Sequence, residues 1–260
     1  MMKKLLTLVV LILVGNLTIA QENLHLIFEF MKVDESQQGA YGETESFWEK
    51  IHEQRVKSGD IIGWDLWALG PGGEDQGFQY LTVTLFSDPV KMLEGGDFGA
   101  ALKAAYPNMS DDELNKTFDK TSKARDLAVR IFSKEISSTT QQFDMPLGCI
   151  AQIDLMKVAL SNYGIYEEAE EKVFKPLHQQ AVDSGGKESW GLIRFMSPIG
   201  SDTYASHMTV SMYKDYAQML SANINYTEGS TPAQTKMMMD GLAARDMKYV
   251  YTARLIRKVR

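Results

Sequence analysis

Residues 26–33 read LIFEFMKV and residues 151–158 read AQIDLMKV, two versions of one segment separated by 125 positions. Both versions alternate strongly apolar residues with less apolar ones, which is the pattern of a half-buried strand. Eight residues after the last Val of each version stands a tyrosine, Tyr41 or Tyr166. Self-similarity at a fixed period indicates that the chain consists of two similar structural units.

The resemblance between the two halves continues to their ends, with the order preserved. The matching pairs are His52 and His178, Ser58-Gly59 and Ser184-Gly185, Trp64 and Trp190, Thr82-Val83 and Thr209-Val210, and Arg125-Asp126 and Arg245-Asp246. Their offset drifts only from 125 to 127 and then to 120, a drift that small changes in loop length explain. We therefore predict one unit over 21–137, a polar linker over 138–148 and a second unit over 149–260.

Each unit is expected to run strand, helix, two strands, helical region and last strand. In the first unit the opening strand is followed by a helix over 43–58, strands over 61–69 and 78–86, and a last strand over 126–136. In the second unit the corresponding segments are 165–184, 189–196, 205–213 and 247–256. This β-α-β-β-α-β order is that of a ferredoxin-like unit, an antiparallel sheet with both helices on one face.

A duplicated chain can cover the open face of each sheet with the other sheet. The sequence thus predicts an α+β protein in which two tandem ferredoxin-like units pack face to face as an internal dimeric barrel. In strand 78–86, the aliphatic side chains of Leu81, Val83 and Leu85 are expected to face the helices. The mixed side, with Tyr80 and Thr82, is expected to face the other sheet.

The first 20 residues show the pattern of an export signal. A basic start, Met1–Lys4, precedes a ten-residue stretch, Leu5–Val14, that is apolar except for Thr7, and small Ala20 stands before Gln21. Ten residues rise only ~15 Å as a helix, about half the hydrocarbon thickness of a bilayer, which argues against a permanent membrane span. We predict cleavage near Ala20/Gln21 and a periplasmic or secreted protein.

Composition excludes several classes of protein. Hydrophobic residues make up 44% of the chain and charged residues 23%, which is typical of a globular protein. The formal net charge of −7 argues against binding to nucleic acid.

Cys149 is the only cysteine, so no intramolecular disulfide can form, and we expect it to be a buried hydrophobe. With four histidines and no HExxH, CxxC, GxSxG, Walker or GxGxxG motif, we predict no metal site.

At this point the sequence resembles the dimeric α+β barrel superfamily, and most of all its tandem NIPSNAP-like members, with EthD-like proteins as relatives. The residues that carry the resemblance are Phe47-Trp48-Glu49-Lys50-Ile51-His52, Phe174-Lys175-Pro176-Leu177-His178, Gly63-Trp64-Asp65-Leu66-Trp67 and the Pro71-Gly72-Gly73 turn. The superfamily includes cofactor-free monooxygenases, haem-handling enzymes, isomerases, decarboxylases and plain ligand binders. The resemblance therefore implies a fold more strongly than a function.

Candidate site residues are the polar and aromatic side chains that a cleft between helix and sheet would gather. They are Tyr41, Trp48, His52, Arg55, Trp64, Trp67, Tyr80, His178, Trp190 and His207. His52 and His178 could serve as acid, base or ligand in such a cleft, or could instead interact with the dipole at a helix C-terminus. The Arg-Asp pairs at 125–126 and 245–246 are interpreted as structural ion pairs or caps.

A second polar group is expected where the two sheets meet. Glu29, Asp154, Tyr80, His207 and Arg194 would form this cluster at the pseudo-twofold centre, either as a proton-transfer site or as a satisfied interface network. The first half carries the denser aromatic and cationic set. We therefore expect the principal pocket within residues 24–136, with His52 and Arg55 as its polar anchors.

The function that these features predict is binding of a small apolar or aromatic molecule by an exported protein. The alternative is an enzyme, either a cofactor-independent monooxygenase or a haem-handling protein, and haem is the one cofactor that the resemblance brings into consideration. The sequence identifies no catalytic residue, and it leaves self-association into a homo-oligomer open.

Overall fold

The computed structural model describes residues 24–140, 143–224 and 230–260. The predicted export signal lies outside these residues. The strands are β1 His25–Lys32, β2 Gly63–Gly70, β3 Tyr80–Phe86, β4 Asp126–Ser138, β5 Ile150–Val158, β6 Ser189–Ser197, β7 His207–Tyr213 and β8 Arg245–Val259. The α-helices are α1 Gln38–Lys57, α2 Pro89–Glu94, α3 Phe98–Ala105, α4 Asp111–Ala124, α5 Tyr163–Ala169, α6 Lys175–Asp183, α7 Tyr216–Ser221 and α8 Pro232–Ala243. A π-helical turn, Glu170–Phe174, connects α5 to α6.

Local sequence signals set where the helices begin and end. Ser110 and Glu113 form a capping box at the start of α4, and Thr231 and Gln234 form one at the start of α8. After α1, Gly59 adopts a φ of 71°, a left-handed conformation that favours glycine. Within the described residues, no helix is long and apolar enough to cross a membrane.

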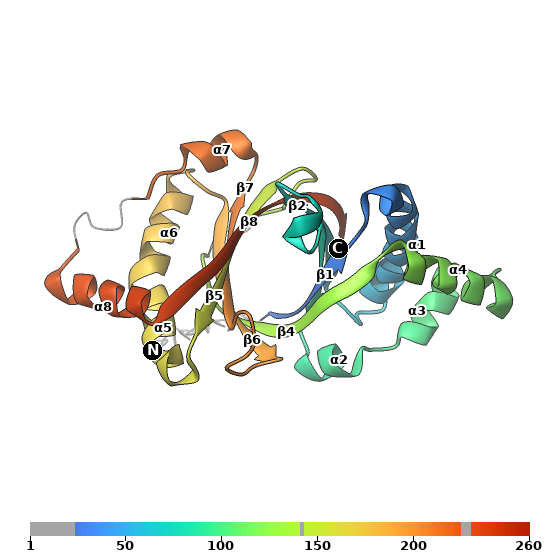
Figure 1. Ribbon diagram of the computed structural model, residues 1–260, viewed down its shortest axis with the longest axis horizontal. Coiled ribbons are helices and arrows are strands. Elements are labelled where there is room, and N and C mark those ends of the chain that lie inside the picture. The colour runs from blue at the N-terminus through green and yellow to red at the C-terminus, as the bar shows by residue number, and fades with distance from the viewer. Residues whose placement is uncertain (1–23, 141–142, 225–229) are drawn as a thin grey trace, which may run out of the picture.

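The eight strands form one closed antiparallel barrel in the order β1-β3-β2-β8-β5-β7-β6-β4. Within the first half the order is β4-β1-β3-β2, and the second half repeats it as β8-β5-β7-β6. The halves join where β2 pairs with β8 and where β4 pairs with β6. The helices of the two halves lie at opposite ends of the molecule with the barrel between them (Figure 1). The α+β barrel is thus confirmed, although its two sheets share hydrogen-bonded edges rather than only facing each other.

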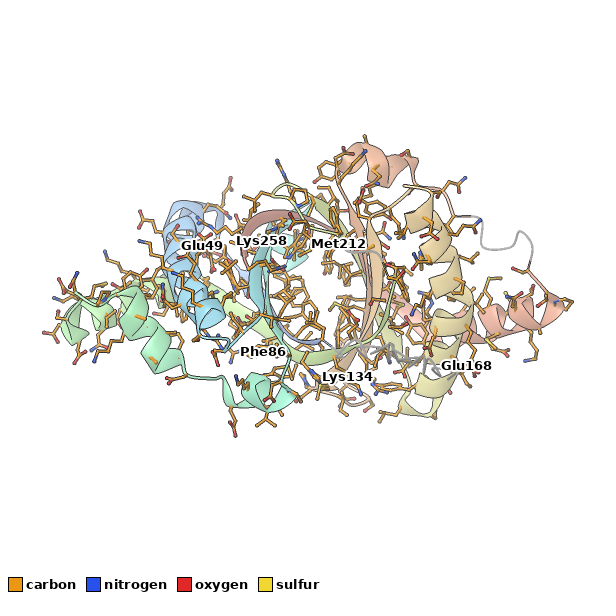
Figure 2. All side chains as sticks on the ribbon, turned by 180° about the vertical axis from the view of Figure 1, so that it is seen from behind. Glu49, Phe86, Lys134, Glu168, Met212 and Lys258 are labelled. Carbon is orange, nitrogen blue, oxygen red and sulfur yellow. The ribbon has the colours of Figure 1, made fainter. Side chains whose placement is uncertain are left out.

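The barrel interior is the main hydrophobic core, which reverses our expectation about strand 78–86. Leu81 and Val83 point into the barrel with Phe28, Ile153 and Leu155 from both halves. Figure 2 shows side chains projecting into the space inside the ring of strands. The prediction was wrong because closing the barrel leaves a narrow interior that only apolar side chains fill well. A cavity of about 290 Å³ remains there.

The mixed side of each strand therefore faces the helices. Thr82 and Thr84 line the cleft beneath α1, and Phe86 packs in the core cluster on that side. Glu29 and Asp154 also lie on this side, one in each half, so they do not meet at the pseudo-twofold centre. The predicted central polar cluster is wrong for the same reason, since the barrel interior would leave such groups without water or partners.

Helix α8 packs against α5 in the second half. This contact allows a prediction about stability. A Cβ at Gly241 would lie 2.3 Å from Cβ of Ala169. We expect Gly241→Ala to lower the free energy of unfolding by about 1–3 kcal/mol, because a packed interface must shift to accept the methyl group. Gly164→Ala is the matched control, since nothing lies within 4 Å of its Cβ position. Chemical denaturation checks the pair, and equal behaviour of the two variants would contradict the packing.

Candidate functional site

A cavity of about 490 Å³ lies between α1 and the outer face of the sheet in the first half. It falls within the size range of small-molecule sites, ~300–1,000 Å³. The side chains that give it chemical character are Glu45, Trp48, His52, Arg55, Trp64 and Arg125. Helix α1 contributes the first four of them, because residues three and four positions apart share one helical face.

His52 lies between two indole rings. Its imidazole stacks on Trp64 with ring centroids 5.0 Å apart and on Trp48 at 6.2 Å. Burial, assisted by the charges of Arg55 and Arg125, lowers the pKa of His52 to about 3. The imidazole is therefore neutral at physiological pH. Its Nδ1 is buried and has no hydrogen-bond partner among the described residues, which makes it an unsatisfied polar atom in the wall of the cleft.

A buried ion pair forms the next part of the cleft wall. Arg125, directly after α4, places Nη1 3.0 Å from Oε1 of Glu45. Glu45 is only 1% exposed, and burial raises the pKa of its carboxyl despite the nearby guanidinium. Burial, together with the charge of Glu45, also raises the pKa of Tyr41, one helical turn earlier. Arg125 further lies over the ring of Trp48 at 5.8 Å.

Ion pairs engage three more of the charged side chains that line this cleft, Arg55, Arg130 and Glu29. Arg55 donates from Nε to Asp60 at 2.6 Å and from Nη2 to the carbonyl of Gly95 at 2.9 Å. Arg130 pairs with Glu29 at 2.6 Å. Arg55 therefore lines the cavity as predicted, but its guanidinium is already engaged. An uncharged hydrogen-bonding group of a ligand suits this cleft better than a full charge.

The second half carries an equivalent cleft of about 670 Å³ beneath α6. His178 stacks on Trp190 at 4.9 Å, and burial followed by the charge of Lys187 lowers the pKa of His178 to about 3. Glu170 corresponds to Glu45, and burial raises its pKa to about 7. The larger cavity thus lies in the second half, contrary to our expectation.

The structure brings together six of the predicted residues in the two clefts and one beside them. Trp48, His52, Arg55 and Trp64 line the first cleft, and His178 and Trp190 line the second. Tyr41 packs beside the first cleft in the core cluster that contains Trp64. Both histidines stand five residues before their helices end and face the clefts, so the alternative in which they interact with the helix C-terminus is wrong.

Three predicted residues line neither cleft. Trp67 belongs to the barrel core, because it stands an odd number of residues from Trp64 along β2 and side chains alternate between faces. The hydroxyl of Tyr80 hydrogen-bonds to Gln38. His207 is fully buried, with Nε2 3.0 Å from Glu167, which also pairs with Arg194. His207 and Arg194 therefore form a local network within one half.

Sequence reasoning missed the two buried glutamates. Glu45 and Glu170 are separated by the same 125 positions as Tyr41 and Tyr166, so the repeat itself contained the signal. The Arg-Asp pairs were interpreted as ion pairs or caps, and Arg125 does form an ion pair, but with Glu45 in the cleft wall. Among the described residues, no group of three or more His, Cys, Asp and Glu side chains is placed to hold a metal ion.

Comparison with known proteins identifies the fold. No family model matches the chain, and no curated protein matches it in sequence. It is similar in structure to an anthrone oxidase-like protein, with a TM-score of 0.53 and 11% identity over 92% of this chain and 93% of the other. It is also similar to a "putative monooxygenase" from Lactobacillus acidophilus NCFM, with a TM-score of 0.52 and 11% identity over 92% and 96% of the two chains. A heme-binding protein from Thermus thermophilus is more distant, with a TM-score of 0.49 and 11% identity over 91% and 92%. The chain thus shares the α+β barrel architecture of the anthrone oxidase-like protein and of the Lactobacillus structure.

Proposed function

We propose that this chain is an exported protein that binds a small planar aromatic molecule bearing a hydroxyl group in the cleft beneath α1. The observation that carries the proposal is the neutral, unpartnered Nδ1 of His52, held between Trp48 and Trp64 in a cavity of about 490 Å³. The indoles offer apolar surface to a flat ring, and the imidazole nitrogen offers one directed hydrogen bond. The signal-like residues 1–20 support export, and the repeated strand order supports an origin from two ferredoxin-like units.

The proposal is tested by titrating the protein with 2-naphthol and with naphthalene, which lacks the hydroxyl. We expect wild type to bind 2-naphthol about 5–10-fold more tightly, the equivalent of one hydrogen bond worth ~1–1.4 kcal/mol. His52→Leu should abolish this preference, because leucine fills the space without the nitrogen. Calorimetry measures both affinities for each protein.

His178→Leu is the matched control, since it makes the same change in the other cleft and should preserve the preference. Failure of wild type to bind either compound at millimolar concentration would contradict the proposal. Survival of the preference in His52→Leu would contradict it as well.

A catalytic role is the second candidate, and the buried carboxyl of Glu45 is the observation that favours it. A cofactor-independent oxygenase needs a base that removes the proton of a phenol or enol before oxygen reacts. The imidazole of His52, with its pKa near 3, is a weak base, whereas burial raises the pKa of Glu45. Oxygen consumption in the presence of 2-naphthol that is lost in Glu45→Gln would support this candidate.

A haem-handling enzyme is the other catalytic alternative. A neutral imidazole is the form that ligates haem iron, and His52 offers one in the first cleft. In the second cleft Nδ1 of His178 lies 3.0 Å from Nζ of Lys187, so that nitrogen is already engaged. A Soret band that appears on adding haem and is lost in His52→Leu would support this form, and a colourless protein would leave the binding function.

A further inference from the structure

Lys187 is a buried lysine in the second cleft, and the first cleft has no lysine at the corresponding position. Lys187 is only 2% exposed, yet it lines the cavity of about 670 Å³ in the second half. Its Nζ lies 3.0 Å from Nδ1 of His178 and donates to Oγ of Ser211 at 2.9 Å. Among the described residues it forms no ion pair with a carboxylate, although buried lysines are ordinarily paired.

The fold itself does not require a lysine at this position. Gly59 and Gly185 end equivalent helices with φ values of 71° and 78°, and Trp64 and Trp190 follow at the same distance. This alignment places Lys187 opposite Ile61, which is 2% exposed and packs in the core of the first half. Burying an amine where an aliphatic side chain serves the same unit is unfavourable unless the amine has a task of its own.

The hydrogen bonds of Lys187 can be kept by the neutral form of its amine. A lysine has no acceptor when charged, so Nδ1 of His178 accepts, which places the proton of the neutral imidazole on Nε2. The two hydrogen bonds, to His178 and Ser211, use both N–H groups of a neutral amine and leave its lone pair unused. Burial lowers the pKa of Lys187 to about 8, and the charge of Asp154 opposes that shift.

The other ionisable groups around this cavity come from every element that packs against it. They are Asp154 on β5, Glu170 on the π-helical turn, His178 on α6, Tyr213 on β7 and Arg245 on β8. The ring of Tyr213 lies 5.6 Å from the lysine nitrogen. Glu170, with a pKa of about 7, can both accept and donate a proton near neutral pH.

We propose that Lys187 captures aldehydes or ketones in the second cleft as a reversible imine. The lone pair of the neutral nitrogen forms a bond to the carbonyl carbon while the carbonyl π electrons move to oxygen. One N–H proton passes to that oxygen to give a carbinolamine. The C–O bond then breaks, and the oxygen leaves as water with the second proton that nitrogen supplies. No oxidant or reductant takes part, and the proposal is independent of ligand binding at His52.

Reductive trapping with the whole folded protein tests this proposal. We expect benzaldehyde with sodium cyanoborohydride at pH 7 to modify Lys187 before any exposed lysine side chain, as located by tandem mass spectrometry. An exposed lysine with a pKa of ~10.4 has about one two-hundredth of the neutral amine that Lys187 has at this pH. The internal comparison is Lys172, whose side chain is 60% exposed.

Two variants and a pH profile decide the outcome. Lys187→Ile, which copies the residue of the first half, should remove the adduct and keep the fold, whereas Lys172→Arg should retain the adduct at Lys187. In wild type the rate of trapping at Lys187 should rise with pH, reach half its maximum near pH 8 and level off above about pH 9. Modification spread over exposed lysines with none at Lys187, or a rate there that still rises at pH 10, would overturn the proposal.

Discussion

Replacing Arg125 with alanine is expected to lower the free energy of unfolding by about 3–5 kcal/mol at pH 7. The variant leaves the carboxyl of Glu45, which is 1% exposed, without the guanidinium that lies 3.0 Å away. The cost should shrink as the pH falls, because a carboxyl whose pKa burial has raised becomes neutral early in an acid titration. Urea denaturation at pH 7 and pH 4 measures both effects.

The double variant Arg125→Ala/Glu45→Gln separates this cause from general damage to the cleft. The glutamine side chain would carry no charge, so a large part of the lost stability should return. Arg130→Ala is the matched control at the same cleft, because the side chain of Arg130 is 52% exposed and its ion pair with Glu29 is worth only ~0–1 kcal/mol. Equal losses in Arg125→Ala and Arg130→Ala would contradict the buried ion pair.

Acid is expected to destabilise wild type more than His52→Phe. The pKa of His52 falls from 6.5 in an exposed chain to about 3 in the folded protein, so the unfolded chain binds the proton first. The stability that the neutral imidazole contributes is present above pH 6.5 and is lost as the pH falls toward 3. Between pH 7 and pH 4 this amounts to about 3 kcal/mol.

Phenylalanine can occupy the space between the two indoles and has no proton to bind. At pH 7 the two proteins should differ by less than about 1.5 kcal/mol, and at pH 4 the variant should be the more stable. Denaturation curves over this range measure the difference between the two proteins, so carboxyl groups that titrate in both cancel. Parallel pH profiles would show that His52 is not held neutral by burial.

The repeat made the architecture predictable, and strand periodicity alone did not. The hairpin predicted over 61–69 and 78–86 forms as β2 and β3, paired antiparallel. Alternation along β3 correctly separated Leu81 from Thr82, but it could not say which side faced the helices, because either side can cover a core. Only the closure of β2 onto β8 and of β4 onto β6 decides that the aliphatic side points inward.

The dependence on the repeat also explains which site residues could be predicted from the sequence. His52, Trp64 and their counterparts were detected because two copies of the pattern carried them. Trp67 was included by residue type, although its position on β2 places it in the barrel. Lys187 escaped detection because the other half has Ile61 there, and a repeat reveals only what both copies retain.

The central claim, that the cleft beneath α1 receives a planar hydroxylated aromatic molecule, is tested most directly by a crystal structure with 2-naphthol. We predict that its ring lies against Trp48 in this cleft, with the hydroxyl within hydrogen-bond distance of Nδ1 of His52. The barrel cavity of about 290 Å³ and the second cleft offer competing locations in the same crystal. Density for 2-naphthol in either of these, with the cleft at His52 holding none, would contradict the claim.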